Sequence, residues 1–77
     1  MLPIQCKMAR TALGWGVRDL AQRASKSPVT VVKFESGEAV RDTTADDLRR
    51  AFEKAGIIFI DSNGGGPGVR LKRKPKR

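Results

Sequence analysis

Apolar and polar positions follow the clearest helical period in the middle of the chain. Leu20, Ala21 and Ala24 lie on one face at helical spacing and predict a helix from Val17 to Ala24 with that face buried. The side chain of Ala21 is small enough for a second helix to cross close to it. We therefore expect this helix to pack against a neighbour.

A second helix is predicted directly after a short polar break. Ser27 is a natural N-cap, and Pro28 suits the first helical position because its missing N–H has no partner there. Val31 and Phe34 are three residues apart and face inward, and Gly37 supplies a stop at or just past the helix end. The two helices and the break between them have the pattern of a helix-turn-helix.

The other face of the second helix carries methyl groups, a hydroxyl and a cation close to the helix N-terminus. These belong to Val29, Thr30 and Lys33. Valine and threonine methyl groups suit the thymine methyl, and lysine favours guanine, when a helix enters the major groove of DNA. We expect this face to read base edges.

An amphipathic helix is predicted for residues 2–13, with Pro3 in its first turn and Gly14 directly after its end. Cys6 lies off the centre of the apolar stripe of this helix, and we expect it to be a passive thiol. The stripe itself is formed by Ile4, Met8, Ala12 and Leu13, with Ala9 beside them.

A further helix is predicted after a polar connection. Thr44 and, three residues later, Asp47 resemble a capping box with Asp in place of Glu, so we expect this helix to begin at Thr44 and to end at Gly56. Trp15 lies in a Gly-Trp-Gly turn, where we expect it to close the end of the core. The apolar side of the further helix is formed by Leu48, Ala51, Phe52 and Ala55.

Beyond this helix the apolar residues follow the period of strands. The β-branched and aromatic run at residues 57–60 and the alternating run at residues 69–71 flank a glycine-rich stretch, so they predict a β-hairpin. The glycine-rich stretch lacks the Lys-Ser/Thr ending of a P-loop, which argues against nucleotide binding. Because an isolated hairpin is marginal in water, we expect it to pack on the preceding helix, to pair with another chain, or to do both. A dimer contact is expected from Ile58 with Ile60 or from Ile57 with Phe59.

Length and residue types limit the classes of function. A chain of 77 residues forms one small domain with a modest core, so pairing with a second copy would add to its stability. One cysteine, no histidine and scattered carboxylates favour a protein that is not an enzyme and has no cofactor and no metal. No apolar run approaches the length of about 20 residues that crosses a bilayer, and no secretory signal is visible, so we expect a cytoplasmic protein.

The net charge of +8 is concentrated at the C-terminal end. Residues 1–69 hold 10 Lys and Arg against 8 Asp and Glu, whereas residues 70–77 hold six Lys and Arg and no carboxylate. A basic, flexible tail at residues 72–77 would attract DNA, RNA or an acidic membrane surface alike, or would serve only to keep the chain in solution. The small number of aromatic residues disfavours RNA binding.

The predicted helices carry a set of residues that together form a recognisable pattern: Arg10, Leu20, Ala21, Ser27, Val31, Phe34, Glu35, Ser36 and Gly37. With these residues, over about residues 4–55, the sequence resembles the xenobiotic-response-element (XRE) family of Cro-type helix-turn-helix regulators, to which phage repressors belong. The resemblance implies a mainly α, lambda-repressor-like bundle of four to five helices over residues 2–56. A C-terminal β-hairpin at residues 57–71 and the basic tail then follow this domain.

The resemblance also assigns contacts to individual positions. The family often has a phosphate-binding glutamine at the start of its second helix, where this chain has Val17, so the backbone or the neighbouring Arg18 would serve. Pro28 takes a position where the family often has a hydrogen-bonding residue, so Lys33 carries most of the direct readout. By position, base contacts fall on Ser27, Pro28, Val29 and Lys33, together with Thr30, with Val32 at the groove wall, and phosphate contacts fall on Val17, Arg18, Ser36 and Arg41.

Two further properties are implied by the resemblance. Arg10 and Glu35 would form a structural ion pair that ties the first helix to the helix that begins at Pro28. The protein would bind a palindromic operator as a homodimer, with half-sites about one helical turn apart, and act as a nucleoid-associated transcriptional repressor. The alternative is an antitoxin or anti-regulator module that binds a protein partner through the hairpin or the exposed valines.

Overall fold

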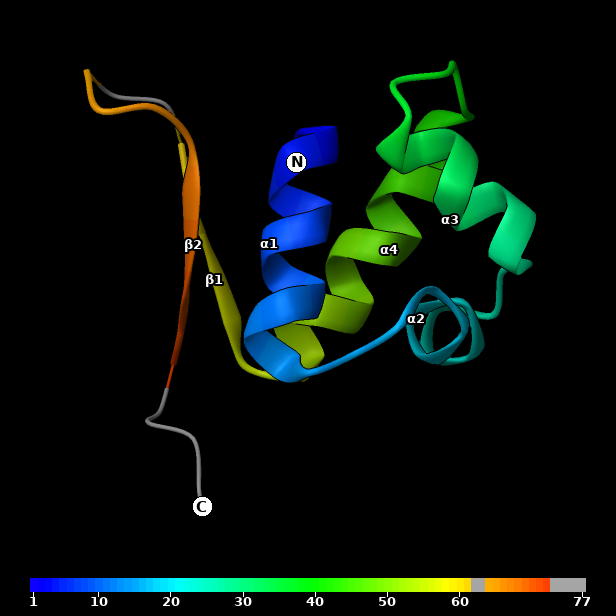
Figure 1. Ribbon diagram of the computed structural model, residues 1–77, viewed down its shortest axis with the longest axis horizontal. Helices are drawn as coiled ribbons and strands as arrows, with labels where there is room; N and C mark the ends of the chain where they lie inside the picture. The colour runs from blue at the N-terminus through cyan, green and yellow to red at the C-terminus, as the bar shows by residue number, and fades with distance from the viewer. Residues whose placement is uncertain (62–63, 73–77) are drawn as a thin grey trace.

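The computed structural model describes residues 1–61 and 64–72, and it contains helices and one small sheet (Figure 1). Within these residues, four helices come first and a two-stranded antiparallel sheet follows them, which confirms the predicted mainly α architecture with a C-terminal hairpin. The rest of the predicted tail, residues 73–77, lies outside the described residues, as do residues 62–63 of the hairpin loop. The elements are α1 (Pro3–Leu13), α2 (Val17–Ala24), α3 (Pro28–Glu35), α4 (Asp42–Lys54), β1 (Ile57–Ile60) and β2 (Gly68–Leu71).

The core lies where all four helices and β1 meet. Phe52 of α4 is at its centre and is fully buried. The ring of Trp15 stacks on Phe52 with 5.7 Å between centroids, and Phe59 meets the same ring edge-on at 6.0 Å. Trp15 therefore closes the core as predicted. The buried apolar residues are Cys6, Ala9, Leu20, Ala21, Ala24, Val31, Phe34, Leu48, Phe52 and Ile57.

The predicted apolar stripe of α1 is confirmed at Ala9, which is buried, and at Leu13, which packs against the core, but it is wrong at Ile4 and Ala12. Ile4 is 53% exposed and Ala12 is exposed, whereas the buried positions of this helix are Gln5, Cys6 and Ala9. Hydropathy missed Gln5 because its side chain is polar, and it missed Cys6 because the expected stripe runs beside this apolar residue and not through it. Gln5 bonds to the hairpin and Cys6 bonds to α3.

Gln5 fastens the hairpin to α1. Its amide nitrogen donates to the carbonyl oxygens of Ile60 and Gly68, at 3.1 Å each, and its amide oxygen accepts from the backbone N–H of Leu2 at 2.8 Å. One side chain thus caps the helix and ties together the ends of both strands. Because a two-stranded sheet is marginal alone, this anchoring helps to explain why the hairpin is ordered.

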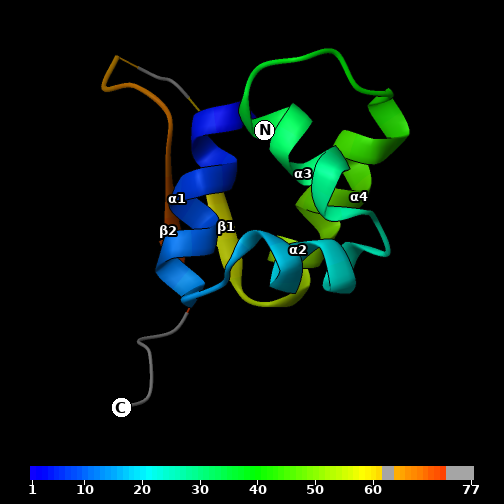
Figure 2. The ribbon, with the colours of Figure 1, turned by 45° about the vertical axis from the view of Figure 1, so that its right-hand side comes forward.

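The hairpin packs on two helices rather than on one. In Figure 2, β1 and β2 run beside α1, and β1 leads directly out of α4, which it also contacts. The prediction that the hairpin packs on the preceding helix is confirmed, and α1 is an additional support. The strands pair in the register Ile57 with Leu71, Ile58 with Arg70, Phe59 with Val69, and Ile60 with Gly68.

Helix α4 begins two residues before the predicted start. Its first residue is Asp42, with Arg41 as N-cap, and Thr44 is buried within the first turn. The capping box is wrong because its two side chains have other environments: Thr44 packs inward and Asp47 pairs with Lys26 at 2.9 Å. None of the helices in residues 1–61 and 64–72 is long and apolar enough to cross a membrane.

Candidate nucleic-acid interface

The ends of α3 are set by the residues that the sequence marked. The Ser27 hydroxyl accepts a hydrogen bond from the backbone N–H of Thr30 at 3.2 Å, and Pro28 occupies the first helical position. At the other end Ser36 is the C-cap, and Gly37 follows with φ of 83°, a left-handed conformation that favours glycine. These caps confirm the predicted bounds of the helix.

The two sides of α3 have different surroundings. Val31 and Phe34 are buried in the core, as predicted. Val29 is 63% exposed and Val32 is 51% exposed, and Lys33 lies exposed on the outer side with them. The exposed side therefore combines two β-branched apolar side chains with a cation.

A wide depression of about 670 Å³ lies between α3 and the segment that leads into α4. Thr30 and Lys33 line it from α3, and Arg41 lines it from the N-cap of α4. The structure thus brings two predicted base-contact residues and one predicted phosphate-contact residue into the same hollow. The remaining lining residues are Lys26, Ala39, Val40 and Thr44.

Lys26 is the lining residue that sequence reasoning missed as part of this site. It precedes the N-cap Ser27 and forms an ion pair with Asp47 of α4 at 2.9 Å. This pair holds the turn between α2 and α3 against α4. Its position inside the turn of the predicted helix-turn-helix could have indicated that Lys26 belongs to the site. Nothing in the sequence identified Asp47 as its partner. The lining of the depression itself contains three cations, Lys26, Lys33 and Arg41, and no carboxylate.

The other predicted phosphate-contact residues are spread around α2 and α3. Val17 begins α2 and is half-buried against the core, whereas Arg18 is exposed. Ser36 is exposed at the C-cap of α3. The backbone N–H of Gly16 is already bound by the Asp19 carboxylate at 2.8 Å. The backbone N–H groups left to bind a DNA phosphate at this helix end are therefore those in the first turn of α2, beside Arg18.

Behind α3, an ion pair joins it to α1. Arg10 Nε lies 2.7 Å from Glu35 Oε2, and Arg10 Nη2 donates to Glu35 Oε1 at 2.8 Å, so the pair is bidentate. A third guanidinium nitrogen, Nη1, donates to the carbonyl oxygen of Trp15 at 3.2 Å. The Cys6 thiol donates to Glu35 Oε2 at 3.0 Å. The carboxylate thus receives three donors.

Burial and these hydrogen bonds change the pKa of Glu35 in opposite directions. Burial raises the pKa of Glu35, but the hydrogen bonds from Arg10 and Cys6 outweigh it, so the pKa lies below the ordinary range. Burial and the neighbouring carboxylate together raise the pKa of the Cys6 thiol. Cys6 is therefore held as a neutral thiol with low reactivity. The cluster fixes α3 in place and leaves its outer side free.

The hairpin residues expected at a dimer contact divide into two pairs. Ile57 is 3% exposed and belongs to the core, and Phe59 lies against Phe52. Ile58 and Ile60 are 36% and 43% exposed and share the outer face of the sheet. Of the four residues, Ile58 and Ile60 are therefore the ones exposed for a contact with a second copy.

Comparison of the sequence with protein-family models finds no match, and comparison with curated proteins finds none either. Within residues 1–61 and 64–72, no group of three or more His, Cys, Asp or Glu side chains is placed to hold a metal ion. Residues and geometry alone therefore carry the functional argument.

Proposed function

We propose that this protein is a sequence-specific DNA-binding regulator of the XRE type, with α2 and α3 as its helix-turn-helix. It acts as a repressor, and α3 enters the major groove of a palindromic operator. The observation that carries the proposal is the outer side of α3, where Val29, Val32 and Lys33 are exposed on a helix whose inner side is fixed by the core and an ion pair.

The exposed valines favour DNA binding over a purely structural role for α3. Val29 and Val32 add nothing to the core, and exposed apolar groups that are grouped together mark binding surfaces. In a major groove their methyl groups would contact thymine methyls, while Lys33 would reach the acceptor atoms of guanine. A helix that served only for packing would give no reason for this arrangement.

The hydroxyls near the start of α3 restrict its readout. Ser27 Oγ and Thr30 Oγ1 are 2.9 Å apart and share a hydrogen bond, so only one of their two protons remains to donate to a base. Pro28 adds no side-chain donor or acceptor. Direct discrimination then depends mainly on Lys33 and on the methyl contacts of Val29.

The second half of the proposal is a homodimer formed through the outer face of the hairpin. Ile58 and Ile60 lie on this face and a facing sheet would cover them. A small domain gains stability from such a contact, and a two-fold dimer would match a palindromic operator. Ile58→Lys with Ile60→Lys would then give a monomer that binds one half-site weakly.

Selection of bound sequences from a random DNA pool tests the proposal directly, with the mass of the full chain in solution recorded in parallel. We expect an enriched palindrome, with half-sites about one helical turn apart, and a dimeric mass. The same selection with Lys33→Ala should lose preference at one base position per half-site while the others persist. Binding that depends on salt and enriches no sequence would contradict the proposal.

A further inference from the structure

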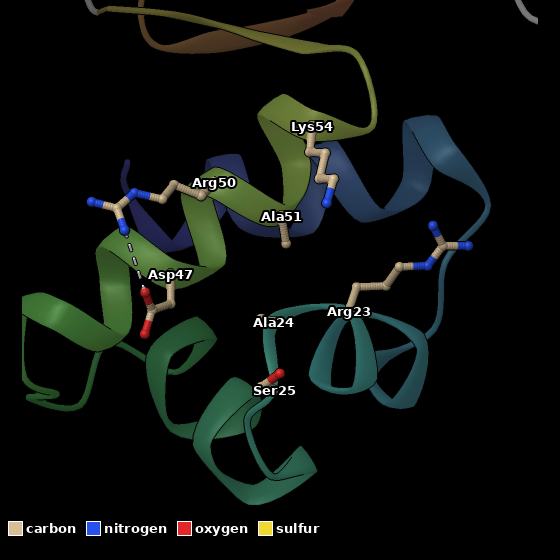
Figure 3. Close-up of a pocket in the computed structure, with 7 residues that line it drawn as sticks. All are labelled: Arg23, Ala24, Ser25, Asp47, Arg50, Ala51 and Lys54. Atoms are coloured by element: carbon tan, nitrogen blue, oxygen red, sulfur yellow. Dashed lines mark ion pairs between the residues drawn. The ribbon is translucent and has the colours of Figure 1, made fainter.

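A second hollow lies on another part of the surface, between the C-terminal end of α2 and the C-terminal half of α4 (Figure 3). Its volume is about 330 Å³, and it is shallow and widely open to solvent. Small side chains, Ala24 from α2 and Ala51 from α4, lie between the longer ones. The groove is completed by Arg23, Ser25, Asp47, Arg50 and Lys54.

Positive charge dominates this groove. Arg23 and Lys54 have no carboxylate within ion-pair distance among residues 1–61 and 64–72. The one acid of the lining, Asp47, is already held by Lys26 at 2.9 Å and lies 3.9 Å from Arg50. Even when Asp47 is counted against Arg50, the positive charges of Arg23 and Lys54 remain in excess in the lining.

One of these cations is held in position before any ligand arrives. The guanidinium carbon of Arg23 lies 4.8 Å from the centroid of the Trp15 ring, which itself stacks on Phe52. Arg23 and Lys54 each lie in the last turn of their helix, where the helix dipole favours a cation. The helix dipole explains why each of these two positions carries a positive charge. It does not explain why cations from two different helices line the same groove.

We propose that this groove binds an extended acidic segment of a partner protein. Its cations come from two helices and flank a floor of alanines, so carboxylate side chains would meet cations while apolar side chains rest on the floor. A single phosphate group fits less well, because the cationic side chains of Arg23, Arg50 and Lys54 are spread along the groove and do not converge on one point (Figure 3). The groove therefore suits a peptide better than a phosphorylated ligand.

Occupation of the groove would act on DNA binding through charge. Ser25 lines the groove and is two residues before Ser27, the N-cap of α3. An acidic segment there would place negative charge beside the proposed reading helix and repel DNA phosphates. This consequence rests on the proposed function, whereas binding of the peptide does not. The partner would thus be an anti-regulator.

Peptide binding is tested on the ¹⁵N-labelled full chain, without DNA. The probe is a synthetic peptide of alternating glutamate and alanine, and the matched probe has glutamine in place of glutamate. We expect the glutamate peptide to shift the amide signals of Ser25 and Ala51, and the glutamine peptide to leave them in place. Arg23→Gln with Lys54→Gln should weaken binding about three- to tenfold.

The matched control changes the same charge elsewhere. Lys7→Gln with Lys72→Gln removes two exposed cations outside the groove and should leave the groove signals responsive to the peptide. Equal loss of affinity in both double variants, or equal binding of the glutamine peptide, would overturn the proposal. Shifts of the same amides by inorganic phosphate or by duplex DNA, with none by the glutamate peptide, would also overturn it.

Regulation is tested separately by adding the glutamate peptide to a protein–DNA complex. We expect it to release DNA from the native chain and to release much less from the Arg23→Gln, Lys54→Gln variant. A peptide that binds the groove without weakening the complex would refute the anti-regulator step alone. A chain that binds the peptide but enriches no DNA sequence would refute the proposed function and leave the groove assignment standing.

Discussion

The two sides of α3 invert the usual distribution of charged and apolar residues. The inner side buries the Glu35 carboxylate, which receives two bonds from Arg10 and one from Cys6. The outer side exposes Val29 and Val32, which have no place in the core. The inner side therefore has its bonding partners within the chain, whereas the outer side leaves apolar groups exposed, and this is where we propose that DNA binds.

This difference separates what holds the fold from what is available for binding. A buried carboxylate needs its partners for the chain to fold, so substitutions at the inner side should act mainly on stability. An exposed valine or lysine changes folding little, so substitutions at the outer side should act mainly on DNA binding. Variants on each side can break this separation or sharpen it.

The largest effect is expected from Arg10→Ala. This variant leaves the buried carboxylate of Glu35 without its bidentate partner and should lower the free energy of unfolding by about 3–5 kcal/mol. Arg50→Ala is the matched control, because it breaks only a long ion pair with Asp47 at 3.9 Å from a side chain that is 77% exposed, and it should cost at most about 0.5 kcal/mol. Thermal melts of both variants provide the measurement. An unchanged melt for Arg10→Ala would show that the pair does not hold α1 to α3.

Acid should weaken the same inner side without any substitution. The pKa of Glu35 is lower in the folded chain than its ordinary value of 4.5, so the unfolded chain takes up the proton first as the pH falls. The stability that the carboxylate adds is complete above that value and is lost as the pH falls through the folded-state pKa. Urea unfolding between about pH 6 and about pH 3 should show a steeper loss for the native chain than for Glu35→Gln. Equal slopes would refute this role for Glu35.

On the outer side, Lys33→Ala should leave unfolding unchanged and weaken DNA binding. The expected loss is about 1–3 kcal/mol at the one base position that Lys33 contacts, with a smaller loss on unrelated sequences. Titration of the selected operator and of variants at each base position provides the measurement. A uniform loss on all sequences would instead make Lys33 a phosphate contact.

The smallest overall effect is expected from Val29→Ser. Because Val29 is 63% exposed, the free energy of unfolding of this variant should stay within about 0.5 kcal/mol of the native value. Its preference for thymine at one position should fall, since the methyl contact is lost. Unfolding curves test the expected stability. Binding to an operator in which uracil replaces thymine tests the loss of the methyl contact. A large loss of stability would place Val29 in the core.

Most of the helical architecture follows from the sequence because the local signals agree with one another. Ser27, Pro28 and Gly37 fix the ends of α3, and the buried positions Leu20 and Phe34 follow simple periodicity. The hairpin follows from a change of period at residues 57–60. These are short-range features, which a linear pattern records directly.

The failures of sequence reasoning share a long-range cause. Gln5 looks polar and surface-exposed, yet its amide bonds to backbone atoms more than 50 residues away. Thr44 looks like a cap, yet it packs inward. For the candidate sites, Lys26 and Arg23 gain their meaning only from Asp47 and Trp15, and no local pattern identifies such partners.

The separation of the two sides of α3 is tested most directly by adding duplex DNA to the ¹⁵N-labelled chain at low salt and recording which amide signals shift. We predict that the signals of Val29, Val32 and Lys33 shift most, while those of Ile58 on the hairpin stay in place. Shifts confined to the hairpin or to the groove between α2 and α4, with α3 unaffected, would contradict the account.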